Sequence, residues 1–228
     1  MIKQIHLNQC DSTQDVLKEQ FMKDPYAEDM LISCDHQLNG RGRGNHLWTS
    51  MPGTLCFSMN LKPHPVLSFT ALEIAVIIAH FFSTKGRELS LKWPNDLWDS
   101  HSKKCGGILV QVHQDKLFAG IGLNLLSQDL SFGSIFDIDS EVTIDKKLWS
   151  KELGEFIAKN RITETLVLKE HWRDRCVHLN KKVVIRDGDF TVEGIFQDLG
   201  EFGEALIMTN SGLKKIYNGS LNFSRESD

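Results

Sequence analysis

The chain has 228 residues, of which 41% are hydrophobic and 25% are charged, and its formal net charge at pH 7 is −4. These values are typical of a globular protein with one large domain, or with one medium and one small domain. The acidic balance excludes a global basic field that would draw the chain to nucleic acid or to an anionic membrane.

The cysteines and histidines indicate the redox compartment of the protein and whether it binds a transition metal. The five cysteines are odd in number and widely spaced, with no CxxC pair, which argues against a disulfide framework and indicates a reducing compartment. The nine histidines show no HExxH pattern, so we predict no protein-bound transition metal. The N-terminus, MIKQIHLNQC, is too polar for a signal peptide, and the longest apolar stretch, 69–82, is too short to span a bilayer. We therefore expect a cytoplasmic protein with no membrane partner.

Helices and strands alternate in the first half of the chain. A helix is expected at 11–21, where Ser12 or Thr13 can cap it and Asp15 follows Ser12 by three residues, as in a capping box. Apolar runs predict the other elements of this half, which are a strand at 30–35, a strand at 54–61 and a buried helix at 66–83, with a Gly/Asn/Arg loop at 36–47.

The second half adds further elements and then changes character. The expected elements are a strand at 89–93, a hairpin of strands at 106–113 and 117–125, and helices at 145–160 and 163–177. Beyond Asn180, short strands broken by Asp-Gly, Leu-Gly and Ser-Gly turns predict a small antiparallel barrel. The fold class is therefore α+β, with a larger domain at 1–178 and a smaller one at 179–228.

The segment GRGRGNHLW, residues 40–48, concentrates flexibility and positive charge. Glycine allows close backbone approach, so that successive N–H groups can surround an anion. The guanidinium groups of Arg41 and Arg43 suit carboxylate or phosphate oxygens, and Trp48 offers a flat face to a ring. The alternative is a mobile surface loop that binds nothing.

The segment KWPNDLW, residues 92–98, places polar groups where a predicted strand ends. Ligands often lie at strand ends in sheets of mixed α and β proteins. Lys92 can meet a phosphate there, and Asp96 can hold Mg²⁺ through oxygen. The alternative is a simple Pro-Asn-Asp turn.

Two glycine-marked strands complete the set of candidate segments. In KKCGGILVQV (103–112), Lys103 and Lys104 precede two glycines that leave room for a ligand, and one lysine there can neutralise a carboxylate; a solvated turn is the alternative. In GIGLNLL (120–126), Asn124 can read a base edge, and tight strand packing is the alternative. The missing third glycine excludes a dinucleotide-binding fingerprint.

Five of these segments, in this order, resemble the pattern of the biotin protein ligase family. They are STQ (12–14), QLNGRGRGNHLW (37–48), KWPND (92–96), KCGGIL (104–109) and GIGLN (120–124). The resemblance implies a mixed-sheet biotin/lipoate ligase catalytic domain followed by a small SH3-like barrel. The chain departs from the pattern at Gln14, where the family has Asn, and at Asn45 and His46, where it often has Gly and Arg. Because the first segment begins at residue 12, a ligase without the DNA-binding domain of some family members, and with no DNA partner, is expected.

The resemblance also implies two half-reactions. The carboxylate of biotin attacks the α-phosphate of MgATP and gives biotinyl-5′-AMP and pyrophosphate. A lysine on the biotin carboxyl carrier domain of a biotin-dependent carboxylase then attacks the mixed anhydride and releases AMP. The protein is expected to be a monomer or a homodimer.

Site residues follow from the same resemblance. Lys104, Arg43 and Asp96 are the expected catalytic residues, with Asp96 as the Mg²⁺ ligand. The residues expected to bind biotin are Ser12, Thr13, Gln14, Gln37, Gly40, Arg41, Gly42, Arg43, Lys104 and Gly107. The residues expected to bind ATP are Arg41, Arg43, Trp48, Lys92, Asn95 and Asn124.

Two other functions stay open at this point. A lipoate or octanoate protein ligase or transferase would share the fold, although the Gly-Arg-Gly-Arg segment favours biotin. An RNA-binding module could use the same loop and the barrel, although the net charge of −4 disfavours it.

Overall fold

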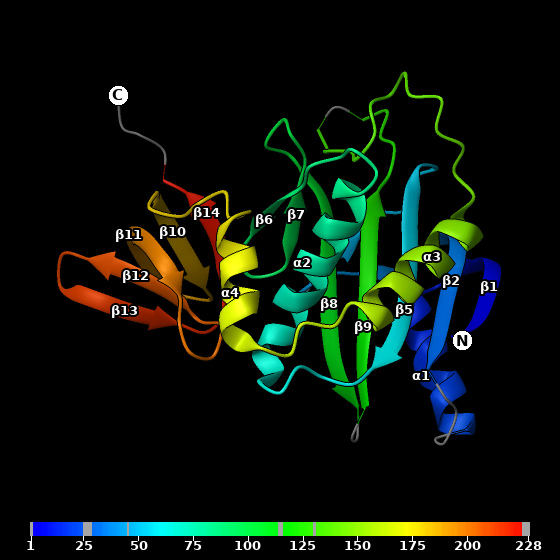
Figure 1. Ribbon diagram of the computed structural model, residues 1–228, viewed down its shortest axis with the longest axis horizontal. Helices are drawn as coiled ribbons and strands as arrows, with labels where there is room; N and C mark the ends of the chain where they lie inside the picture. Colours follow the sequence, from blue (N-terminus) through cyan, green and yellow to red (C-terminus); the bar gives the residue numbers. More distant parts are fainter. Residues whose placement is uncertain (1, 25–28, 45, 114–115, 130, 225–228) are drawn as a thin grey trace.

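A seven-stranded mixed sheet dominates the computed structural model, which describes residues 2–24, 29–44, 46–113, 116–129 and 131–224 (Figure 1). Its strand order is β1-β2-β5-β9-β8-β7-β6. The strands are β1 (Lys3–Cys10), β2 (Met30–Gln37), β5 (Thr54–Leu61), β6 (Ser90–Lys92), β7 (Asp96–Trp98), β8 (Lys104–His113) and β9 (Lys116–Asn124). β1 runs parallel to β2 and the other neighbouring pairs are antiparallel, so the predicted mixed sheet is confirmed.

Helices pack on both faces of this sheet (Figure 1). α1 (Thr13–Lys23) lies on one face, α2 (Thr70–Ser83) and α3 (Lys146–Lys159) lie on the other, and α4 (Thr165–Arg173) packs against α2. Side chains alternate between the faces of a strand, so Leu31 joins the large core beneath α2 and α3, whereas Met30 and Ile32 join a small core with Leu17 of α1. α1 packs mainly on β2, β5 and β9, which leaves the same face of β8 to other segments.

The C-terminal part of the chain forms the small antiparallel sheet that was expected, in the order β13-β12-β11-β10-β14. Its strands are β10 (Lys182–Asp187), β11 (Phe190–Leu199), β12 (Ala205–Thr209), β13 (Gly212–Ile216) and β14 (Ser220–Phe223). Val183 and Phe196 are fully buried in the same continuous core as α2. Trp93, in the β6–β7 turn, donates from Nε1 to the carbonyl of Gly203 at 3.1 Å. The barrel is therefore packed onto the larger part of the molecule, and a domain boundary at 178/179 stays a prediction.

Several element bounds differ from the sequence predictions. Residues 3–10 form β1, which the mixed polar and apolar sequence KQIHLNQC did not indicate. The helix expected at 66–83 begins with a 3₁₀ turn, Leu67–Phe69, and α2 itself has 14 residues. α4 ends at Arg173, four residues before the expected end at 177. Within the described part of the chain, no helix is long and apolar enough to cross a membrane.

The capping box predicted for α1 is wrong. Ser12 occupies the N-cap position, but its side chain makes no capping hydrogen bond. The backbone N–H of Thr13 is instead met by the Oε1 atom of Gln37 at 2.8 Å. Asp15 turns away from the helix start and pairs with Arg41 at 2.7 Å. Tertiary partners have replaced the local ones that the capping pattern predicts.

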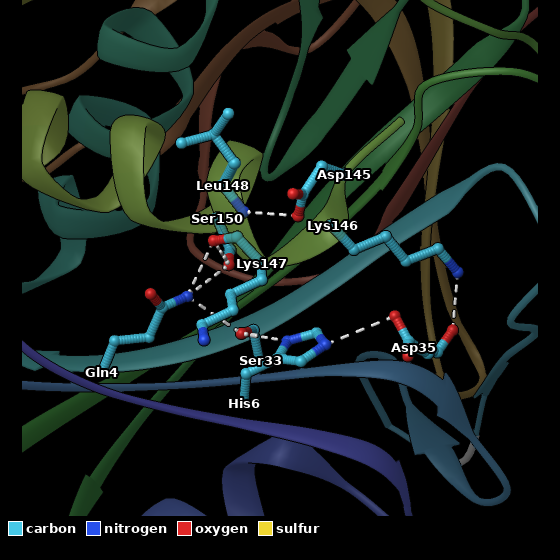
Figure 2. A network of polar contacts seen from close by, with 9 residues as sticks. All are labelled: Gln4, His6, Ser33, Asp35, Asp145, Lys146, Lys147, Leu148 and Ser150. Carbon is cyan, nitrogen blue, oxygen red and sulfur yellow. Dashed lines mark hydrogen bonds and ion pairs between the residues drawn. The ribbon is translucent and has the colours of Figure 1, made fainter. Parts of the chain in front are cut away.

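A polar network fastens the edge strand β1 to β2 and α3 (Figure 2). The Nε2 atom of Gln4 donates to the hydroxyls of Ser33 and Ser150 at 3.2 and 3.0 Å. The His6 ring lies between Ser33 Oγ, 3.0 Å from Nδ1, and Asp35 Oδ1, 3.4 Å from Nε2. These contacts compensate for the few apolar side chains that β1 contributes to the core.

His178 lies between α4 and β10 and is fully buried. Its ring centroid is 4.3 Å from that of Phe196 and 5.7 Å from that of Trp172. Neither ring nitrogen has a hydrogen-bond partner among the described residues. Burial lowers the pKa of His178 to about 3, and the nearby charges of Lys92 and Lys181 act in the same direction. The folded protein therefore holds this histidine neutral.

This buried histidine predicts a pH-dependent stability. Because the folded-state pKa lies below the ordinary value of 6.5, the His178 contribution is complete above pH 6.5 and declines as pH falls toward 3. We expect it to lower the free energy of unfolding by up to about 1.4 kcal/mol per pH unit over that range. Urea unfolding at pH 7, 6, 5 and 4 measures the slope. His178→Leu should reduce the slope of the unfolding free energy against pH. The control His101→Leu, at an exposed histidine, should leave this slope unchanged. An unchanged slope in His178→Leu would contradict the prediction.

Candidate functional site

A cavity of about 440 Å³ opens on the face of the sheet that carries α1. It is bounded by the start of α1, the segment 40–48, the β6–β7 hairpin, strands β8 and β9, and the start of β14. All the residues predicted for the site line it, except Gly40 and Asn124. Its size is that of a small-molecule site, and it brings together segments that are far apart in the sequence.

Part of the cavity wall consists of buried hydroxyl and amide groups. Thr13 donates from its hydroxyl to Gln37 Oε1 at 3.0 Å, and its Oγ1 lies 2.8 Å from the hydroxyl of Ser58. Gln14 donates from Nε2 to the carbonyls of Leu109 and Phe118 at 3.0 and 3.3 Å, which leaves its Oε1 available as an acceptor. Uncharged donors and acceptors of this kind suit a polar, neutral group of a ligand.

The two glycines of GIGLN give the adjoining side chains their room. A Cβ atom at Gly122 would lie 2.4–2.8 Å from indole atoms of Trp48, and one at Gly120 would lie 3.1–3.4 Å from the amide of Gln14. The indole and the amide therefore lie directly against the backbone of β9. The glycines therefore allow tight packing, as the alternative interpretation of this segment predicts. This packing shapes the cavity wall.

Residues 40–44 and 46–48 form the two sides of a small hairpin, called the hairpin 40–48 below, which lines the cavity. β3 (Gly40–Arg41) pairs with β4 (Leu47–Trp48), and the N–H of Gly42 donates to the His46 carbonyl at 2.8 Å. Gly44 has a φ of +60°, a left-handed conformation that glycine adopts without strain. Gly40 pairs with Trp48 in this hairpin and does not line the cavity. Asn45, which stands where the family often has Gly, lies outside the described residues.

The two arginines of this hairpin point in different directions. Arg41 pairs with Asp15 of α1 at 2.7 Å. Arg43 reaches the C-terminal barrel, where it donates from Nη1 to the carbonyl of Gly219 at 3.2 Å and from Nη2 to Asn218 Oδ1. Burial lowers the pKa of Arg43, and the charges of Asp96 and Asp187 oppose this effect. A partly buried cation that lines a cavity attracts an anionic ligand.

The cavity is also lined by two lysines around one carboxylate. Lys104 Nζ lies 2.6 Å from Asp96 Oδ1, and Lys92 Nζ lies 3.9 Å from Asp96 Oδ2. Burial lowers the pKa of Lys92, which Asp96 partly offsets. The β6–β7 hairpin sets this geometry, because Lys92 pairs with Asp96 across it and Asp96 pairs with Gly107 of β8. The backbone of KWPND thus forms the turn that the alternative interpretation predicts. The side chains of this segment line the cavity.

Asp96 is also the residue that could hold a divalent cation. Among the described residues it is the one carboxylate that lines the cavity. No group of three or more histidine, cysteine, aspartate or glutamate residues in the described chain could form a metal site by itself. Mg²⁺ is commonly bound through one or two carboxylates together with substrate phosphates. A single carboxylate in a cavity that is also lined by Arg43, Lys92 and Lys104, which can bind phosphates, fits that arrangement.

Two predicted nucleotide-binding amides have protein partners in this structure. Asn95 donates from Nδ2 to the carbonyl of Ile108 at 2.7 Å and thereby holds the β6–β7 turn on β8. Asn124 is buried, accepts from Thr54 Oγ1 at 3.1 Å and donates to the carbonyl of Gly133 at 3.2 Å. Asn95 lines the cavity and Asn124 does not. The nucleotide roles of both stay predictions.

Sequence reasoning missed the contributions of Ser58 and of the barrel. Ser58 lies on the α1 face of β5, where a polar residue inside an apolar strand could have marked a ligand site. Gly219, Ser220 and Asn222 line the cavity from the edge of the barrel. No local signal marks them, because their place depends on how the barrel packs against the sheet.

Comparisons with known proteins agree with this geometry. Residues 7–126 match the biotin/lipoate A/B protein ligase family, and residues 178–220 match the biotin protein ligase C-terminal domain. The bifunctional ligase/repressor BirA of Bacillus subtilis is 26% identical over 222 residues, which are 85% of this chain and 66% of that protein. The biotin–[acetyl-CoA-carboxylase] ligase of Mycobacterium tuberculosis is 26% identical over 192 residues, 76% of this chain and 71% of that protein.

Structural similarity extends over nearly the whole chain. The structure of the biotin protein ligase from Aquifex aeolicus in complex with biotin and ATP has a TM-score of 0.79 and 27% sequence identity, and the match covers 98% of this chain and 100% of that one. The chain spans just under two thirds of the Bacillus relative. Since the family match alone extends over more than half of its residues, the chain belongs to the biotin/lipoate A/B protein ligase family.

Proposed function

We propose that the protein is an ATP-dependent biotin protein ligase, which activates biotin as biotinyl-5′-AMP and transfers it to a lysine of a carrier protein. One observation carries the proposal: the same cavity is lined by neutral polar side chains, such as Thr13 and Gln37, and by cationic side chains, among them Arg43, Lys92 and Lys104. Biotin has a neutral ureido head and an anionic carboxylate, and ATP is strongly anionic. The Aquifex protein, which binds biotin and ATP, supports this choice of ligands.

Activation of biotin requires two anions to meet. The carboxylate is ionised at neutral pH, so it can attack the α-phosphate without a general base. The nucleophile forms a C–O–P anhydride while the bond between the α- and β-phosphates breaks, and pyrophosphate leaves with the electron pair. The task of the protein is therefore positioning and positive charge. Lys104 contacts the carboxylate and the α-phosphate, while Lys92 and Arg43 contact the phosphates.

The remaining predicted residues bind either biotin or the nucleotide. Ser12, Thr13, Gln14 and Gln37 bind the biotin head, and Arg41, Gly42 and Gly107 its chain and carboxylate. Trp48, Asn95 and Asn124 serve the nucleotide. Asp96 holds Mg²⁺, which supplies charge neutralisation to the phosphates when it is bound. The hairpin 40–48 covers the adenylate and shields the anhydride from water.

Transfer requires a neutral lysine amine from the partner, although a free lysine has a pKa near 10.4. The amine attacks the acyl carbon of the anhydride, an amide bond forms and AMP leaves. Asp96 or a phosphate oxygen accepts the proton that the amine loses. The partner is a biotin carboxyl carrier domain of a biotin-dependent carboxylase, as the name of the Mycobacterium relative suggests. The five free cysteines favour a cytoplasmic setting.

Substrate choice is the direct test of this function. Purified protein is incubated with MgATP and with biotin, lipoate or octanoate in separate reactions, and pyrophosphate release is measured. We expect release with biotin, followed by biotinylation of an added carrier domain detected by mass spectrometry. Release with lipoate or octanoate but not with biotin would favour the second candidate, a lipoate or octanoate ligase of the same fold.

Lys104→Ala should abolish adenylate formation while the fold is retained. The substitution removes the ammonium that contacts both reacting groups, which should cost on the order of 3–4 kcal/mol of transition-state stabilisation. Single-turnover pyrophosphate release measures this step. The matched control is Lys103→Ala, the exposed neighbouring lysine, which should stay near wild type. A normal rate in Lys104→Ala would show that another lysine has the assigned role.

Arg43→Gly should loosen the hairpin and let biotinyl-AMP escape into solution. The variant loses both the positive charge and the two hydrogen bonds to the barrel. Filtration after a single turnover separates free from bound adenylate, and we expect most of it to be free. Arg43→Lys keeps the charge without the planar fork and should retain an intermediate share. Complete retention in Arg43→Gly would argue against the covering role of the hairpin.

A further inference from the structure

Arg43 is held by neutral oxygens of the C-terminal barrel. Its guanidinium donates to the backbone carbonyl of Gly219 and to the side-chain oxygen of Asn218, both in the turn between β13 and β14. The contact joins residues 175 or more positions apart in the sequence. It is a direct polar link between the hairpin 40–48 and the barrel, at the edge where both line the cavity.

The two acceptors are fixed by their own surroundings. Gly219 has a φ of +130°, and a Cβ atom there would lie 2.7 Å from Ile185 Cγ2 and 2.8 Å from the Arg186 carbonyl, so only glycine fits. Asn218 donates from Nδ2 to Asp187 Oδ1 at 3.4 Å, which directs its Oδ1 toward Arg43. The turn therefore presents both oxygens to the guanidinium in a set position.

This mode of holding differs from that of the other cations in the cavity. Arg41 is paired with Asp15, and Lys92 and Lys104 share Asp96. Within the described chain, Arg43 alone among the four has no ion pair within 4 Å, so its charge is not cancelled by a bound carboxylate. A guanidinium has five N–H donors, and the barrel uses two of them. Three donors remain for an anion.

We propose that Asn218, together with the carbonyl of Gly219, is a positioning residue that keeps Arg43 and the hairpin 40–48 closed over the cavity. The barrel thereby sets how long an activated acyl-adenylate is held before the acceptor lysine arrives. The inference rests on the proposed function for the identity of that intermediate. The hydrogen bonds between Arg43 and the barrel involve protein groups alone, so the positioning role can be tested without any substrate.

The substrate-free test is hydrogen exchange of the hairpin. Peptides covering residues 40–48 are followed by mass spectrometry in the wild type, in Asn218→Ala and in Asn210→Ala. Asn210 is an exposed asparagine in the β12–β13 turn of the same barrel and does not line the cavity, so it is the matched control. We expect faster exchange of the hairpin in Asn218→Ala only. Equal exchange in all three proteins would overturn the proposal.

The second test asks whether Asn218 acts through Arg43. Asn218→Ala should release biotinyl-AMP about tenfold faster than wild type, as expected for the loss of one hydrogen bond to a charged group. The same substitution in an Arg43→Ala background should add no further change. An equal acceleration in both backgrounds would mean a merely structural role and would overturn the proposal. If wild type forms no adenylate while the exchange result is as expected, the proposed function fails and the positioning role of Asn218 stands.

Discussion

Holding four positive side chains around one cavity is the constraint on which the rest of this structure depends. Arg41, Arg43, Lys92 and Lys104 come from three segments of the chain, and burial works against the charges of Lys92 and Arg43. Asp96 offsets this cost for Lys92, and carboxylates also pair with Arg41 and Lys104, whereas Arg43 is held by neutral oxygens of the barrel. An incoming phosphate or carboxylate therefore meets charges that are already gathered, and little reorganisation is needed when the anion binds.

The sheet provides the rigid wall against which these charges are arranged. β8 and β9 pair along their whole shared length, so the residues on their cavity face have fixed positions. The glycines at 120 and 122 let Gln14 and Trp48 lie on the backbone of β9. The short β6–β7 hairpin then carries Lys92 and Asp96 to the same wall. Segments with little regular structure of their own are positioned by the stiffest part of the molecule.

Sequence reasoning worked where the signal is local. A continuous apolar run identified the buried α2, two strand-like runs identified the β8–β9 hairpin, and the glycines and arginines identified the segment 40–48. It failed for β1, whose polar side chains are satisfied by a network with α3, and for the cap of α1, where Gln37 replaces Ser12. No sequence pattern marks the barrel residues that line the cavity, because their position depends on packing between distant segments. Local rules fail where tertiary partners satisfy a polar group.

The barrel is small, and this explains why its packing also serves the site. A sheet of five short strands buries too little apolar surface to be stable by itself, and here its core is continuous with that of the larger sheet. Trp93, in the turn between two cavity-lining strands, bonds to the barrel at Gly203, and Trp98 packs edge-on against Phe223 at 5.7 Å. The contacts that stabilise the barrel therefore also fix the edge of β14 beside the cavity. Stability and site geometry depend on the same interface, so a change that loosens the barrel disturbs the cationic side chains that line the cavity as well.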